Sequence, residues 1–467
     1  MNISRRSFVK GGAALAAVPA FARAGETPKL RFGLISDIHI SRSQHSAKRV
    51  FRPALEWFRD QGVDAVVCNG DLATTGMLVE LENMSRAWYE VFPDDKLPDG
   101  RKVEKVFVYG NHDTEPGVIR YAIKGGYEEE FRRASVQRDR AYAWEKCLHE
   151  PFAPVYIKRI KGYAFIGAHW VDSPSIKGAP EFVEAHRAEL AGDLPFFYCQ
   201  HAPLKGTVNE RTSKGHCDNG DMTKALSGFP NAIALTGHSH SALTDETSIW
   251  QGAFTAVNAA ALANSGRRYT HPWFENSDVP GSPSEAYPNR KGSQMAQLPT
   301  ERDGAQGMLV DVFEDRIVFR RRSFIFNEPN GDDWVVPLPL GKEKPYLVET
   351  RKAASRPPQF AAGAKVSAVE RDGFNREKEP VRQLVVSFPA ATLGTRPFGY
   401  EVTVASDAPG SKPVARCVLS PDFHLPPSRR VDRAECVFAV RDLPAEGTRS
   451  VSVRAFDSFL NYGKPIS

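Results

Sequence analysis

Short apolar runs alternate with longer amphipathic stretches through the first half of the chain. The apolar runs are followed by glycine or polar residues and have the length of buried β-strands. Segments such as Phe51–Asp60 and Met77–Val91, which lie between them, have the apolar spacing of helices. Strands that alternate with helices predict an α/β architecture. Six segments are predicted strands: Leu30–Ser36, Asp64–Gly70, Lys105–Asn111, Tyr163–Trp170, Pro195–His201 and Ala232–His238.

The pattern changes after about residue 264. Residues Ser265–Gly304 are polar and have little periodicity, so we expect a long surface loop there. The stretch Gly307–Phe324 predicts two strands around an acidic turn, and these strands could close a sheet. Thr350–Phe360 predicts a linker, because its two consecutive prolines cannot continue a helix.

Short strand patterns follow the linker, among them QLVVSF, YEVTV, CVFAV and SVSVRAF. Turn-forming residues separate them, which predicts an all-β immunoglobulin-like sandwich. The stretches LPAEGTRSVSVRAFD and NYGKPI resemble a fibronectin type III domain, although Arg449 stands where that family usually has the tyrosine of its corner motif. We therefore expect four parts: a leader over 1–24, an α/β domain over 25–349, a linker over 350–360 and a β domain over 361–467.

The N-terminus has the pattern of a targeting segment. SRRSFVK precedes the apolar, Ala-rich run GGAALAAVPAFA, and Ala22-Arg23-Ala24 is a small-x-small cleavage site. The apolar run is too short to span a bilayer, so no transmembrane segment is expected. The paired arginines resemble those of the twin-arginine export signal, which implies export of a folded protein, with the periplasm as its destination.

Charge and cysteine content add two expectations. The chain has 467 residues and a formal net charge of +5, but four basic residues lie in the first 24 positions, and the rest is nearly balanced at 57 basic against 56 acidic residues. Binding of nucleic acid is therefore not expected. Six cysteines show no CxxC spacing, and an exported protein can form disulfides. Cys417 and Cys436 are the expected pair, because both lie in strand-like runs of one segment.

Side chains with metal-binding chemistry follow five of the predicted strands. Taken singly, each has an ordinary structural interpretation: Asp37 and Asp71 as helix caps, Asn111 as a turn residue and His201 as a buried, hydrogen-bonded histidine. Strand ends can meet at one edge of a sheet, so groups far apart in sequence can converge. Five clusters in this order are hard to explain otherwise: D-x-H at Asp37 and His39, G-D at Asp71, G-N-H-D at 110–113, His201, and G-H-x-H at His238 and His240.

This ordered set resembles that of the calcineurin-like metallophosphoesterases, over about Leu30 to Phe324. The resemblance implies a two-sheet αββα sandwich, here followed by the all-β sandwich. It assigns Asp37, His39, Asp71 and His240 to one metal. It assigns Asn111, His201, His238 and again Asp71 to a second metal, so that Asp71 bridges.

Oxygen and imidazole ligands without thiolate suit two divalent or mixed-valence ions of Mn, Fe or Zn. Two such ions lower the pKa of a shared water, and the resulting hydroxide would attack a phosphate ester. The resemblance places His112 toward the substrate as general acid or leaving-group stabiliser. The alternative is that His112 only packs against the metal ligands.

The sequence departs from the family at Thr74, three residues after Asp71. Some branches have an aspartate there that orients the catalytic histidine, and purple acid phosphatases have a tyrosine ligand. A purple iron centre is therefore not expected, and the sequence leaves open whether Asp113 orients His112. His169 and His216 are expected to pack or to be exposed rather than to contact substrate.

Three functions remain open at this point. The first is an exported dimetal phosphoesterase. The second is a phosphodiesterase that acts on cyclic nucleotides or phospholipid head groups. The third is a binding or adhesion protein with an inactive phosphoesterase fold, whose C-terminal domain could contact protein or glycan. The complete ligand set favours an enzyme, and the absence of GxxxxGK and of a GxGxxG after a strand argues against nucleotide-triphosphate and dinucleotide binding.

Overall fold

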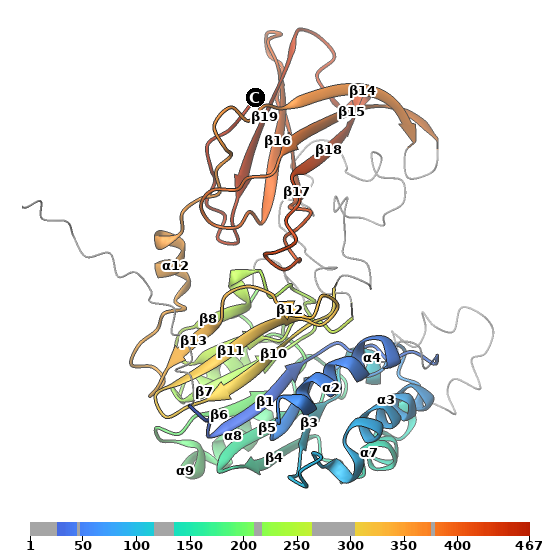
Figure 1. The fold of residues 1–467 in the computed structure, drawn as a ribbon, viewed down its shortest axis with the longest axis vertical. Helices are drawn as coiled ribbons and strands as arrows, with labels where there is room; N and C mark the ends of the chain where they lie inside the picture. Colours follow the sequence, from blue (N-terminus) through green and yellow to red (C-terminus); the bar gives the residue numbers. More distant parts are fainter. Residues whose placement is uncertain (1–25, 44–46, 116–134, 210–216, 264–303, 375–378) are drawn as a thin grey trace, which may run out of the picture.

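The computed structural model describes residues 26–43, 47–115, 135–209, 217–263, 304–374 and 379–467 (Figure 1). The leader, the predicted loop Ser265–Gly304 up to residue 303, and His216 lie outside the described residues. Among the described residues, no helix is long and apolar enough to cross a membrane.

The first sheet is mixed, and its strand order is β12-β11-β10-β1-β2-β3, with β13 also paired to β11. The strands β1, β2 and β3 run parallel, β10 pairs antiparallel with β1, and β11 pairs antiparallel with β10. The two strands that the sequence predicts over Gly307–Phe324 are therefore confirmed. The acidic turn 313–315 joins β10 to β11. The strands are β1 Leu30–Ile35, β2 Ala65–Asn69, β3 Glu104–Val108, β10 Gln306–Val312, β11 Arg316–Ser323, β12 Glu328–Pro329 and β13 Trp334–Pro337.

The second sheet has the order β4-β5-β6-β7-β9-β8. Its central strands β5, β6, β7 and β9 are parallel, and the two edge strands are antiparallel to their neighbours. The strands are β4 Val155–Ile160, β5 Tyr163–Ala168, β6 Phe196–Cys199, β7 Ala232–Thr236, β8 Ile249–Gln251 and β9 Thr255–Asn258.

Alternation of side chains along the strands builds an αββα sandwich. In β1, Leu30, Phe32 and Leu34 point between the two sheets, whereas Ile35 packs toward the helices. The ring of Phe32 contacts those of Phe165 and Phe197 in the second sheet, at centroid distances of 5.4 and 5.0 Å. The expected fold class is therefore confirmed for this part of the chain.

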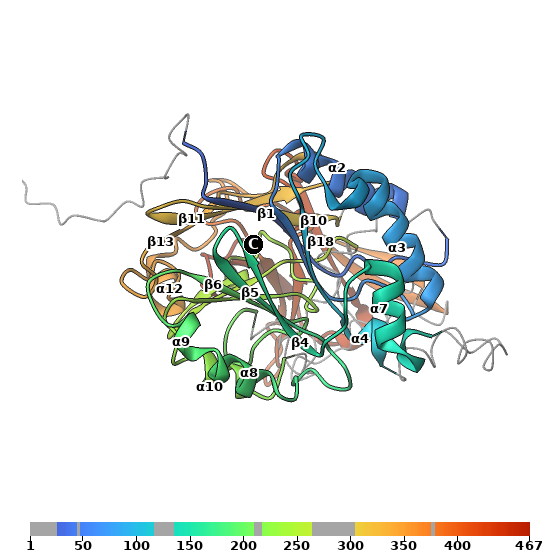
Figure 2. The ribbon, with the colours of Figure 1, turned by 90° about the horizontal axis from the view of Figure 1, so that it is seen from below.

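Helices cover the outer faces of both sheets (Figure 2). Those beside the first sheet are α2 Arg52–Asp60, α3 Leu78–Val91 and α7 Arg140–Leu148, preceded by the π-helical turn η1 Ala47–Phe51. Those on the second sheet's side are α8 Ala179–Ala185, α9 Arg187–Leu190 and α10 Asp221–Leu226. The described part of this domain also contains the single turns α4 Asn111–Thr114, η2 Pro93–Asp95, η3 Val136–Arg138 and η4 Glu246–Ser248.

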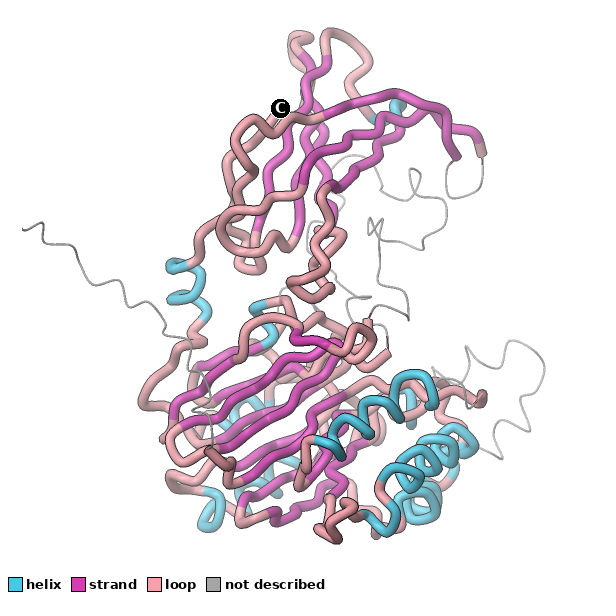
Figure 3. The backbone as a smooth tube through the Cα atoms, viewed as in Figure 1, coloured by secondary structure: helices cyan, strands magenta, loops and turns pink. Residues whose placement is uncertain are grey.

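The C-terminal segment forms two three-stranded antiparallel sheets that share one hydrophobic core (Figure 3). This arrangement is a β sandwich, as expected. The helix α12 Val348–Ala354 covers the first half of the predicted linker, and the two prolines lie after its end. The strands are β14 Ser367–Phe374, β15 Pro380–Pro389 and β18 Arg433–Ala439 in one sheet, and β16 Gly399–Ser406, β17 Val414–Leu419 and β19 Arg449–Phe456 in the other, with a turn η5 Val440–Asp442.

The expected disulfide between Cys417 and Cys436 is wrong, because both cysteines are free. Cys436 on β18 points into the core between the two sheets. Cys417 on β17 points away from that core and packs with Leu419 and Phe456. The two residues share a segment and an extended conformation, but alternation places their side chains on different faces.

Candidate metal centre

The ends of β1, β2, β6 and β7 meet at one end of the sandwich, where the chain following each strand bonds to its neighbour. The Asp37 amide donates to the Gly70 carbonyl and the His39 amide to the Asp71 carbonyl, both at 2.9 Å. The Gly237 amide donates to the His201 carbonyl at 2.8 Å. These bonds align neighbouring loops within each sheet, and the His238 amide, which donates to Asp37 Oδ2 at 2.9 Å, joins the loops of the two sheets.

Five of the seven predicted ligands have a left-handed backbone, although none is glycine. Such a conformation costs of order 1–3 kcal/mol per residue and persists only where the surrounding structure enforces it. Because five such residues occur together here, the packing of the surrounding structure must stabilise this strained backbone, and this backbone directs their side chains inward. The five are Asp37, His39, Asp71, His238 and His240, with φ between 44° and 64°.

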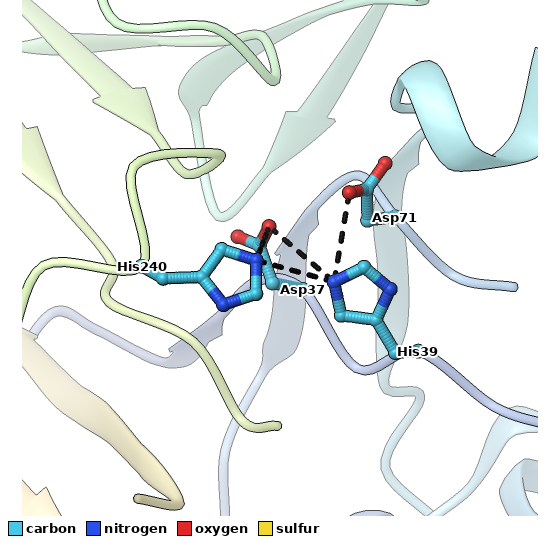
Figure 4. Close-up of side chains that lie close together, drawn as sticks. All are labelled: Asp37, His39, Asp71 and His240. Carbon is cyan, nitrogen blue, oxygen red and sulfur yellow. Dashed lines mark hydrogen bonds and ion pairs between the residues drawn. The ribbon is translucent and has the colours of Figure 1, made fainter. Parts of the chain in front are cut away.

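The first group consists of Asp37, His39, Asp71 and His240 (Figure 4). Their ligand atoms all lie within 4.8 Å of one another. The Nε2 atoms of His39 and His240 are 3.2 Å apart, and His240 Nε2 is 3.0 Å from Asp37 Oδ1. His39 Nε2 is 3.6 Å from Asp71 Oδ2. Nitrogen and oxygen lone pairs therefore converge on one point.

The second group consists of Asp71, His201 and His238, and it shares Asp71 with the first. His201 Nε2 lies 3.2 Å from Asp71 Oδ1 and 3.1 Å from His238 Nδ1. The Asn111 amide oxygen lies 3.2 Å from the same nitrogen, so Asn111 joins this group. His201 Nδ1 donates to the Asn69 carbonyl at 2.5 Å, which leaves Nε2 with the lone pair when the ring is neutral.

Each of the two aspartates has one oxygen held by hydrogen bonds and one that makes no hydrogen bond and faces the imidazoles of the cluster. Asp37 Oδ2 accepts from the Ser36 hydroxyl at 2.6 Å and from the His238 amide at 2.9 Å, and Asp71 Oδ1 accepts from the His112 amide at 2.9 Å. Asp37 Oδ1 and Asp71 Oδ2 are buried and make no hydrogen bond among the described residues. Buried carboxylate oxygens without donors fit cation ligands, so the residues present suit a pair of metal ions.

The electrostatics of the cluster agree with this interpretation. Burial alone would raise the pKa of Asp37 and Asp71, but neighbouring imidazoles, His240 for Asp37 and His201 for both, outweigh it and hold both pKa values below their usual range. Burial lowers the pKa of His39 to about 3, so its ring is neutral at physiological pH. Both aspartates are therefore charged, as metal ligands must be.

His201 predicts the pH dependence of metal binding. Burial would lower its pKa, but Asp71 and Asp37 raise it to about 9, so the metal-free protein holds a proton on Nε2 at pH 7. A metal must displace this proton. We expect the apparent metal affinity to rise with pH from 6 to 8, by up to about tenfold per unit for each proton displaced, and to level off above pH 9. Calorimetric titration in two buffers of different ionisation enthalpy counts the released protons; a pH-independent affinity would contradict the expectation.

His112 lies beside the two groups but in neither. Its Nδ1 lies 2.7 Å from the Thr74 carbonyl, which can only accept, so Nδ1 carries the hydrogen and Nε2 faces the cluster, 3.9 Å from Asp71 Oδ2. Asp113 does not orient it. The Asp113 carboxylate instead accepts from the amides of Leu72, Ala73 and Gly110 and fixes the loops around the site. Burial and the nearby Asp71 raise the pKa of Asp113 to about 8.

The structure adds one side chain that the sequence reasoning missed. The Trp170 ring packs against those of His201 and His238, at centroid distances of 5.8 and 5.4 Å, and its indole nitrogen donates to Glu115 at 3.0 Å. Its position, two residues after the end of β5 and at the same end of the sheet as the ligands, is the sequence feature that could have identified it. His169, one residue earlier, is a packing residue as expected: it is buried, its Nδ1 accepts from the Tyr109 amide, and burial lowers its pKa to about 3.

Gly237 allows the two ligand loops to approach each other. A Cβ at this position would lie 1.8 Å from Ser36 Oγ and 2.7 Å from Asp37 Oδ2. We expect Gly237→Ala to displace Asp37, to weaken metal binding and to lower the stability by about 1–3 kcal/mol, as overpacking does. Metal content and thermal unfolding measure both effects. The control is Gly178→Asn, since Gly178 has open space around it and Asn accepts its left-handed backbone; normal metal content in Gly237→Ala would contradict the argument.

An αββα sandwich with carboxylates and imidazoles gathered at its strand ends has the architecture of a metallophosphoesterase domain. The model of the calcineurin-like phosphoesterase family matches residues 30–242, so this part of the chain is similar to that family. The model of the twin-arginine translocation signal matches residues 2–22, which indicates export by that pathway. No curated protein matches the chain.

Solved structures with similarity to the chain are distant. A conserved uncharacterized protein of Streptococcus pneumoniae TIGR4, described as a predicted phosphoesterase, is 13% identical with a TM-score of 0.26, covering 66% of this chain and 97% of that chain. GAP50, described as the anchor in the inner membrane complex of Plasmodium, is 12% identical with a TM-score of 0.36 (68% and 90% covered). Vps29 of Entamoeba histolytica, complexed with Zn²⁺, is 11% identical with a TM-score of 0.29 (66% and 99% covered).

Proposed function

We propose that the chain is an exported phosphoesterase that hydrolyses a phosphate ester with two divalent or mixed-valence ions of Mn, Fe or Zn. One observation carries the proposal: the two groups of ligand atoms share Asp71, and each aspartate aims inward one buried oxygen that makes no hydrogen bond. When bound, such a pair of ions supplies an activated water and neutralises charge on the phosphoryl oxygens. The match of residues 30–242 to the calcineurin-like phosphoesterase model supports the reaction class.

The ligands divide according to the two groups. Asp37, His39 and His240 would hold one ion, and Asn111, His201 and His238 the other, with Asp71 common to both. A carboxylate suits the shared position because its negative charge offsets the repulsion between two cations. Oxygen and nitrogen donors without thiolate favour Mn, Fe or Zn.

His112 would assist departure of the alcohol. The Thr74 carbonyl holds Nδ1–H, so Nε2 is the atom that can carry a proton toward the leaving oxygen. The ring packs edge-on against His39, at a centroid distance of 4.6 Å, which restricts its rotation. This geometry fits a proton donor beside the metal ligands.

The proposal extends to the parts of the chain. Residues 1–24 would be removed on export to the periplasm, 25–349 would form the catalytic domain and 361–467 a fibronectin type III-like domain. Arg449 supports that last assignment: its Nε donates to the Pro444 carbonyl at 2.8 Å, a bond to upstream backbone like the one that the corner tyrosine makes.

A turnover screen tests the proposed function and its phosphodiesterase alternative. The purified chain is loaded separately with Mn, Fe or Zn and offered phosphomonoesters, cyclic nucleotides, other phosphodiesters and phospholipids. We expect metal-dependent turnover of at least one class and none from Asp71→Asn in parallel. Full metal occupancy without turnover of any class would favour a binding protein instead.

A further inference from the structure

The loop that carries His238 and His240 continues directly into a contact with the C-terminal sandwich. Ala242, two residues after His240, is fully buried and packs in a cluster with Phe398, Phe423 and Phe456 of the sandwich. The Thr244 hydroxyl donates to the Phe423 carbonyl. The Glu246 amide donates to the Ser458 hydroxyl at 3.3 Å. The sandwich therefore holds the chain within a few residues of a candidate metal ligand.

Gln306, on the first sheet, ties three segments together at this contact. It is fully buried; its amide oxygen accepts from the Leu243 amide at 2.8 Å, and its amide nitrogen donates to the His424 carbonyl at 2.7 Å. Its backbone amide donates to the Ala261 carbonyl at 3.1 Å. The next two backbone amides, of Leu262 and Ala263, donate to the carbonyls of Ser36 and Asp37. The same residue thus connects the sandwich to the segments of both His240 and Asp37.

The sandwich presents these acceptors from a well-braced loop, residues 420–425. Asp422 accepts from the Ser420 hydroxyl at 2.6 Å. The Arg396 guanidinium donates to the Leu425 carbonyl at 2.7 Å and also to the Asp422 carbonyl. Phe423 packs against the ring of Phe398 at a centroid distance of 6.0 Å. A loop fixed in this way can restrict the movement of the segment 241–246, which it contacts.

His238 and His240 need such external support, because their left-handed backbone is unfavourable by itself. We propose that the C-terminal sandwich is a positioning element of the metal centre: its loop 420–425 holds the segment 241–246, directly and through Gln306, so that His240 stays aimed at the first group. This inference rests on the proposed metal binding and assigns the second domain a role in it.

The test uses the full chain and measures metal affinity by competition with a chelator. Thr244→Val removes the donor to the Phe423 carbonyl at nearly constant volume, and Thr244→Ser restores it. Gln306→Met removes both amide contacts at similar length. Ser387→Ala is the matched control, since its hydroxyl bonds to Glu435 on an exposed part of the same sandwich. Loss of a group that orients metal ligands typically weakens binding 10–100-fold, and we expect this for Thr244→Val and Gln306→Met, with Thr244→Ser and Ser387→Ala near the wild type.

Thermal unfolding without and with metal separates positioning from general stability. A positioning role predicts that the metal-induced rise in Tm shrinks in Thr244→Val and Gln306→Met. A lower Tm with wild-type metal affinity would overturn the inference and leave the proposed function intact. Absence of metal binding by the wild-type chain would overturn both.

Discussion

Asp71→Asn is expected to lose metal from both positions and with it nearly all phosphoesterase activity. Asp71 is the one side chain common to the two groups of ligand atoms, and its unpartnered oxygen is buried. The side-chain amide of asparagine lacks the negative charge with which the Asp71 carboxylate offsets the repulsion between two cations. We therefore expect a larger loss of affinity than the roughly 10–100-fold that follows from disturbing an orienting group. Elemental analysis of the purified variant measures the bound metal.

The substitution should not unfold the protein, which makes the result interpretable. Asn accepts the left-handed backbone at this position, where φ is 52°, and its oxygen can still accept from the His112 amide. His240→Asn is the comparison: Asn accepts that backbone too, and the loss should fall mainly on one of the two metal equivalents. Two full equivalents in Asp71→Asn with normal turnover would refute the shared role.

His112→Ala should keep both metals and lose most activity on alkyl phosphate esters. His112 is outside both groups of ligand atoms, and its Nε2 faces them. An alkoxide needs a proton as it leaves phosphorus, whereas a nitrophenolate leaves without one. A general acid is typically worth about 10²–10⁴-fold in rate, so we expect a loss in this range on alkyl esters and a much smaller one on nitrophenyl esters.

The comparison requires kcat on both ester types and metal content from one preparation. His169→Ala is not a suitable control, because that ring is buried and packed. His186→Ala is suitable, since its ring bonds locally to the Phe182 carbonyl at 2.8 Å on the far face of the second sheet. Equal losses on the two ester types would remove the acid role, and loss of metal would make His112 a structural residue.

Local patterns in the sequence predicted much of the fold, because burial in a sheet sandwich leaves apolar runs along the central strands, whereas β4, β8, β9, β12 and β13 were not predicted. The runs at Leu30, Ala65 and Ala232 all became central parallel strands. The positions of Asp37, Asp71 and His201, just after the ends of strands, could be recognised as candidate ligand positions from residue type and order. The structure then brought them together. The boundaries of the predicted linker differ from the structure: its first residues belong to helix α12, because only its two prolines carry a strong local signal and they lie after the helix.

The sequence by itself determined most of the central strands, the kinds of ligand atoms and their order along the chain, because these depend on side-chain chemistry and on short periodicities. Only the tertiary structure decided which atoms meet. The carbonyl that orients His112 belongs to Thr74, and a backbone carbonyl is the same in every residue, so no residue type reveals it. The free state of Cys417 and Cys436, and the contact of Gln306 with His424, depend on which faces of distant strands are packed together. Gln306 and His424 are more than 100 positions apart in the chain, and local sequence patterns contain no information about contacts over such separations.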